Sequence, residues 1–145
     1  MKEVYKLLKF NYAPLWKRIF AYIIDISLLN LIIIVPFKSI INVYKDPKTI
    51  LLSKTNALDI SIALLAIIGL ILIYFIYTEY KTKQTLGKLL FGIKVMPDNA
   101  TLKQIFIRNI TKPFGILLIF DTLYILKTGN QRYTEIISKT WISNK

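Results

Sequence analysis

The run from Ile19 to Phe37 constrains this chain most, because it is long and apolar and contains a single charged residue, Asp25. At a rise of about 1.5 Å per residue, its roughly nineteen residues are enough to cross about 30 Å of hydrocarbon. A basic pair, Lys17–Arg18, precedes the run, and Lys38 follows it. The sequence therefore predicts a membrane-spanning helix over about residues 17–37.

Asp25 is the anomaly in this helix, because a carboxylate at that depth costs about 2.5–3.5 kcal/mol unless it is paired, protonated or facing water. Arg18 lies on the same helical stripe about two turns earlier, too far away to be a direct neighbour. Two interpretations follow. In one, Asp25 accepts a proton or cation and Arg18 tunes its charge state. In the other, Arg18 is a positively charged anchor at the membrane surface and Asp25 is a buried structural partner of another helix.

Two further apolar runs predict the remaining helices of the membrane domain. Residues 57–78 are mostly Ile, Leu and Ala and predict a second span. The run over about 113–127 is short for a span, which favours a short, kinked or re-entrant helix. A helix that continues from residue 102 and crosses with a kink at Pro113 is the alternative.

The segment between these runs combines short strands with an amphipathic helix. Residues 92–96 predict a strand that pairs with a second one near 141–142. Thr101 is followed three residues later by Gln104, a capping-box pattern that predicts an amphipathic helix over about 102–112. We therefore expect a single all-α integral membrane domain over residues 1–145, with two long transmembrane helices, a third short apolar helix and a small cytoplasmic segment.

Composition and charge support a membrane location. The chain is 54% hydrophobic, its formal charge is +12, and its basic residues flank the apolar runs. Such residues attract anionic lipid headgroups, each by about 1 kcal/mol. We expect the bilayer and those headgroups as partners, and no nucleic acid, because the chain has neither a basic helix nor an aromatic RNA-binding platform. Lys and Arg are concentrated in the lead-in and in residues 79–112, so the N-terminus and that segment should be cytoplasmic.

The residue types present exclude several kinds of chemistry. The chain contains no cysteine and no histidine, so thiol and histidine acid–base catalysis are absent. No Ser or Thr follows Lys88, so the spacing of a phosphate-binding loop fails. We predict no enzyme, no cofactor and no resident metal. Asp121 is the second carboxylate in an apolar run: it either joins Asp25 in a paired cation site or lies on the watery side of an interfacial helix.

Four stretches, in this order, resemble the RDD family of small membrane proteins, and the resemblance covers about residues 12–143. Arg18 to Asp25 is similar to the arginine and first aspartate on the family's first helix. A segment after the second span and an Arg–Asn pair at 108–109 are similar to its central motifs. The closing segment has Glu135 where the family's second aspartate is expected, which lengthens the arm of that carboxylate. The matched positions in the central motifs are Thr85, Gly87, Lys88, Gly92 and Arg108.

The resemblance implies a multi-pass α-helical protein of the cell membrane, with transport of an unidentified ligand and, for some members, cation–proton exchange. Our first hypothesis is therefore a transport-related protein that works as a homo-oligomer, because the two or three spans of one copy are few to enclose a transport pathway. Asp25 would accept the cation or proton, Arg18 would tune it, and Glu135 and Asp121 would complete the polar site. The second hypothesis is a non-transporting scaffold or accessory subunit in which these residues form a structural network.

Overall fold

The protein is described by a computed structural model that covers residues 11–36, 38 and 57–144. Most of the basic lead-in, including the N-terminus predicted to be cytoplasmic, lies outside the described residues. The connection after the first apolar run lies outside them as well.

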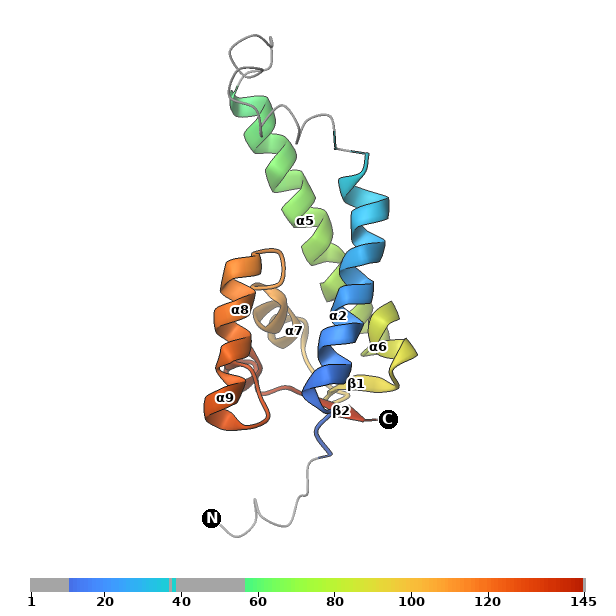
Figure 1. The fold of residues 1–145 in the computed structure, drawn as a ribbon, viewed down its shortest axis with the longest axis vertical. Helices are drawn as coiled ribbons and strands as arrows, with labels where there is room; N and C mark the ends of the chain where they lie inside the picture. Colours follow the sequence, from blue (N-terminus) through green and yellow to red (C-terminus); the bar gives the residue numbers. More distant parts are fainter. Residues whose placement is uncertain (1–10, 37, 39–56, 145) are drawn as a thin grey trace.

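Two helices run side by side and extend beyond the rest of the molecule (Figure 1). Helix α2, Leu15–Leu29, begins after Pro14, whose extended backbone suits the residue before a helix, and it passes into a π-helical turn, η1, Asn30–Ile34. Helix α5 covers Ala57–Thr82. The two pack through a buried apolar cluster of Leu29, Ile33, Ile67, Ile71 and Phe75.

Within the described residues, one helical stretch is long and apolar enough to cross a membrane, Ser61–Thr82 of α5. Large apolar side chains such as Leu65 and Ile73 remain exposed on it, which suits a helix that faces lipid. The first apolar run forms an α-helix of 15 residues before the π-helical turn begins at Asn30. Of the two long transmembrane helices that we predicted, the structure therefore supports one as a candidate span.

A small antiparallel ribbon lies at one end of this helix pair. Strand β1, Ile93–Met96, pairs with β2, Trp141–Asn144, so that Val95 lies opposite Ile142. The chain just before α2 joins the ribbon, because Tyr12 bridges to Ser143 and the Ala13 N–H donates to the Ile142 carbonyl at 2.9 Å. The residues at the start and at the end of the described chain are therefore hydrogen-bonded to each other.

Helix α6, Leu86–Leu90, connects α5 to the ribbon and packs closely on α2. A Cβ at Gly87 would overlap the backbone carbonyl of Ala21, so only glycine allows this approach. Gly92 has a φ of 60°, a conformation that favours glycine and that turns the chain from α6 into β1. Two of the central motif glycines thus have backbone reasons to be glycine.

The C-terminal third contains four short helices: α7, Leu102–Asn109; α8, Gly115–Leu123; α9, Ile125–Thr128; and α10, Tyr133–Ile137. The structure contains the predicted capping box at Thr101 and Gln104. Helix α7 ends three residues before the predicted boundary, because Pro113 disfavours a helical conformation just before it. The third apolar run is divided between α8 and α9. At nine residues, α8 spans about 14 Å and is too short to cross a bilayer by itself.

Candidate functional site

Among the residues that the structure describes, four acidic ones are buried in the helical region above the ribbon: Asp25, Glu79, Asp121 and Glu135. Glu79 and Glu135 are 0% exposed, and Asp25 is 1% exposed. An ionised carboxylate without partners would be very costly there. The donors around each of them therefore define the site.

Glu79, near the C-terminal end of α5, binds donors from three other segments. Its Oε1 accepts from Lys112 Nζ at 2.7 Å and also from Lys88 Nζ. Its Oε2 accepts from Asn109 Nδ2 at 2.9 Å and lies 3.1 Å from Arg108 Nε. One carboxylate thus connects α5 with α6, α7 and the turn after α7.

Glu135, in the first turn of α10, binds three arginines. Its carboxylate oxygens lie 3.0 Å from Arg108 Nη2, 3.3 Å from Arg132 Nε and 3.4 Å from Arg18 Nη1. It also accepts from the backbone N–H of Arg132 at 3.2 Å, an N-terminal capping contact for α10. Burial alone would raise the pKa of Glu135, but Arg132, Arg108 and Arg18 outweigh it and lower the pKa to about 2.

Asp121 of α8 is held mainly by the start of α10. The Thr134 N–H and hydroxyl each donate to it at 2.8 Å, the Thr111 hydroxyl donates at 3.1 Å, and Arg132 Nη1 lies 3.3 Å away. Arg132 therefore links Asp121 to Glu135. In the same way, Arg108 links Glu135 to Glu79, so that three carboxylates belong to one connected ionic network.

Asp25 has a different kind of environment, made of neutral donors. Its Oδ1 accepts from the Tyr74 hydroxyl and from the Gly87 N–H, both at 2.9 Å, and its Oδ2 accepts from the Thr85 hydroxyl at 2.5 Å. Thr85 and Gly87 lie at the start of α6, so Asp25 fastens that helix to α2 and α5. Three hydrogen bonds offset much of the cost of burying this carboxylate.

The structure brings some of the predicted site residues together and keeps others apart. Arg18 meets Glu135 and the carbonyls of residues 13, 130 and 142, whereas Asp25 binds the α6 motif. Asp25 and Asp121 have different partners, and no three acidic side chains among the described residues gather as they would to hold a metal ion. The roles predicted for Arg18, Asp25, Asp121 and Glu135 stay predictions.

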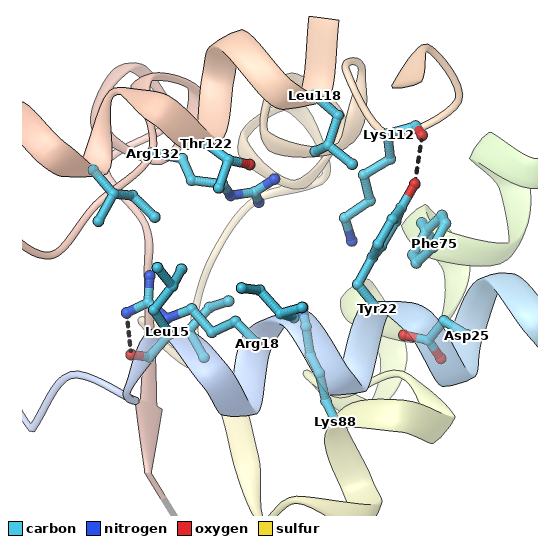
Figure 2. Close-up of a pocket in the computed structure, with 13 residues that line it drawn as sticks. Leu15, Arg18, Tyr22, Asp25, Phe75, Lys88, Lys112, Leu118, Thr122 and Arg132 are labelled. Atoms are coloured by element: carbon cyan, nitrogen blue, oxygen red, sulfur yellow. Dashed lines mark hydrogen bonds between the residues drawn. The ribbon is translucent and has the colours of Figure 1, made fainter. Parts of the chain in front are cut away.

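A cavity of about 110 Å³ lies between α2 and α8, beside the ionic network. Figure 2 shows Lys112 and Arg132 pointing into it from the side of α8, opposite Tyr22 on α2. The Tyr22 hydroxyl donates to the Lys112 carbonyl at 3.1 Å, and Lys112 Nζ lies 3.9 Å from the centre of the Phe75 ring. The charged side chains of the lining are Arg18, Asp25, Lys88, Lys112 and Arg132.

The two lysines of this lining, Lys88 and Lys112, have lowered pKa values. Burial lowers the pKa of Lys88, with Arg108 acting in the same direction and Glu79 opposing it. Burial likewise lowers the pKa of Lys112 well below its usual value, although Glu79 again favours the charged form. The cause is desolvation of two ammonium groups that share one carboxylate oxygen.

Glu79, Lys112 and Arg132 are central to the network and were not predicted as site residues. The signal for Glu79 is its isolation: it is the only acidic residue between Asp59 and Asp98, in a stretch that contains several lysines. It lies where the apolar run ends, and that position makes it resemble an exposed boundary residue. Lys112 pairs with a carboxylate 33 positions away, a contact that only the tertiary fold creates.

The comparisons with known proteins agree with these motifs. The family model described as the RDD family matches residues 12–136, which is most of the chain. No match is found among the curated proteins or among the solved structures. The matched region contains the buried carboxylates, the α6 motif and the cavity lining up to Arg132. The chain therefore belongs to the RDD family and is a membrane protein.

Proposed function

We propose that this membrane protein binds a small acidic group in the cavity between α2 and α8 and that this binding serves transport of an anion. The observation that carries the proposal is the charge of the cavity wall: four basic side chains face one carboxylate, Asp25. Since both oxygens of Asp25 already accept hydrogen bonds from neutral donors, it offers little to an incoming cation.

The charge balance of the buried cluster supports an anionic ligand. Four basic residues, including Arg108, are buried with four carboxylates, and the half-buried Arg18 beside them adds one positive charge when all these groups are ionised. An uncompensated buried charge is costly, and an anion in the cavity would neutralise it. Each ammonium group has three N–H donors. Lys88 and Lys112 both use one on Glu79 Oε1, which leaves donors for a ligand.

Proton handling, expected from the sequence through Asp25, enters this proposal through the lysines instead. An anion favours the charged form of Lys88 and Lys112, whose pKa values are lowered by burial. Anion affinity therefore falls as the pH rises through the lowered pKa values. Such coupling would give a transporter that moves an anion together with a proton.

The test is calorimetric titration of the purified full chain in a non-ionic detergent with inorganic phosphate and with acetate. Lys112→Gln removes one charged donor, so we expect affinity to fall by about ten- to a hundredfold. Lys94→Gln is the matched control, because Lys94 lies on β1 and pairs with the exposed Asp98. Equal anion affinity in the natural protein and Lys112→Gln would refute the proposal.

A flux assay then separates an anion from a cation. Proteoliposomes with the natural protein and with Asp25→Asn would be driven by phosphate or acetate gradients, and separately by Na⁺, Li⁺ or K⁺ gradients. We expect proton movement with the anion gradients. Proton movement driven by a cation gradient and lost in an Asp25→Asn variant that remains folded would favour the cation site predicted from the sequence.

The second candidate function is a scaffold, and the connectivity of the network favours it. Glu79, Glu135 and Asp121, with their partners, tie α2, α5, α7, α8 and α10 together. A scaffold needs these contacts for stability and needs no ligand. Absence of anion binding in the natural protein, together with strong destabilisation when Glu79 is neutralised, would support this role.

A further inference from the structure

An apolar groove continues from the cationic cavity along α8 and α9. Its lining consists of Leu and Ile side chains with a single hydroxyl residue, Thr122, and its volume is about 270 Å³. The cavity and the groove share four lining residues, so a basic cavity and an apolar groove lie next to each other. The shared residues are Leu15, Leu118, Thr122 and Ile125.

The groove borders a surface that suits contact with acyl chains. Beside it, Ile116 and Phe120 of α8 are 72% and 68% exposed, and Leu126 of α9, which lines the groove, is 82% exposed. Large apolar side chains exposed this fully are costly in water and suit a hydrocarbon environment. If this surface contacts the bilayer, a ligand could enter the groove directly from the hydrocarbon.

We propose that the ligand is a single-chain lipid acid from the bilayer, whose carboxylate or phosphate lies at the basic end of the cavity and whose hydrocarbon chain lies along the α8–α9 groove. This rests on the proposed anion site and specifies its substrate class. Charge complementarity fixes the head group: Lys88, Lys112 and Arg132 line the cavity beside the groove. The groove, lined almost wholly by aliphatic side chains, would hold the hydrocarbon chain.

Chain length provides the quantitative signature of this ligand. Each methylene removed from water raises affinity about fourfold, so binding should strengthen from acetate to hexanoate to decanoate until the groove is filled. Decanol, which has the same chain and no charge, should bind much more weakly than decanoate. Decyl phosphate should bind like decanoate, because the basic side chains recognise both acids.

The experiment titrates these ligands calorimetrically into the purified full chain, below their own micelle concentrations. Leu123→Gln places a polar side chain in the groove without touching the cavity lining, and Ile116→Gln changes the same helix outside both. We expect Leu123→Gln to weaken decanoate at least about tenfold and to leave acetate unchanged. Ile116→Gln should change neither.

The outcomes separate this inference from the anion site on which it rests. Equal affinities for acetate and decanoate, both reduced in Lys112→Gln, would overturn the lipid acid and keep the anion site. Decanol binding as tightly as decanoate would overturn the head-group assignment. No effect of Lys112→Gln on any acid would overturn both proposals, whereas displacement of decanoate only by two-chain anionic lipids would refute the single chain.

Discussion

Neutralising Glu79 should destabilise this protein more than any other conservative change to a side chain of its ionic network. The variant Glu79→Gln preserves the size and shape of the residue and removes its charge. One carboxylate oxygen accepts from Lys88 and Lys112, and the other accepts from Asn109 and forms an ion pair with Arg108 Nε at 3.1 Å. A glutamine amide has one acceptor side, so either both lysines or Asn109 lose an acceptor, and in both orientations the cations lose the negative charge.

The magnitude follows from the burial of the partners. Glu79 and Arg108 are 0% exposed, and Lys88 and Lys112 are 5% exposed, so water cannot replace the lost carboxylate. Breaking a buried ion pair by removing one partner costs about 3–5 kcal/mol, because a charge is left without compensation. We expect a loss in the free energy of unfolding at the upper end of this range, since Lys88 and Lys112 pair with this carboxylate alone and Arg108 shares it with Glu135.

The assay is reversible unfolding of the purified protein in mixed micelles, followed by circular dichroism. The matched control is Asp98→Asn, which removes the same charge from an exposed pair: Lys94 Nζ and Asp98 lie 3.4 Å apart, and the Asp98 side chain is 64% exposed. Such a pair contributes about 0.5 kcal/mol or less. If Glu79→Gln has the same free energy of unfolding as Asp98→Asn, Glu79 does not hold the ionic network together and the prediction is refuted.

Three further predictions use the same unfolding assay. Asp25→Asn should lose about 2–3 kcal/mol, because charge-assisted hydrogen bonds hold α6 at this carboxylate; a loss below about 0.5 kcal/mol would contradict that. Gly87→Ala should prevent stable folding, since its Cβ would overlap the carbonyl of Ala21. Gly115→Ala, with open space around it, should fold normally. Two equally stable variants would count against the close packing of α6 on α2. The pKa of Glu135 is about 2 in the folded protein and 4.5 ordinarily, so this carboxylate contributes about 3 kcal/mol to the free energy of unfolding. The contribution is complete above pH 4.5 and is lost as the pH falls towards 2. Glu135→Gln should flatten this part of the pH profile of stability, and an unchanged profile would show that the carboxylate is not stabilised.

The sequence identifies Asp25 as a key residue because one charged group in an apolar run stands out by its cost alone. Its partners could not be found in the same way. Tyr74 and Gly87 lie 49 and 62 positions away, and their proximity depends on how α5 and α6 fold back on α2. Local signals such as the capping box at Thr101 depend on neighbouring residues only, and these appear in the structure as predicted.

The pairing of Arg18 was less accessible for the same reason. Helical spacing relates it to Asp25, yet Glu135, 117 positions away, lies 3.4 Å from its guanidinium. Periodicity describes one helix and contains no information on which helix packs against it. The basic character of the cavity was also hidden, because its lining comes from several separate segments whose lysines and arginines look like surface residues in the sequence.

The ribbon joins residues 11–13, 93–96 and 141–144. These contacts restrict how many times the chain can cross a membrane. Strands that are hydrogen-bonded to one another lie on the same side of a bilayer, so the chain must cross an even number of times between any two of them. If α5 crosses the bilayer, a second crossing must therefore occur elsewhere between residue 13 and β1. Between β1 and β2, α7 and α8 have eight and nine residues, so each is too short to span a bilayer by itself. A reporter fused to either end should face the same compartment.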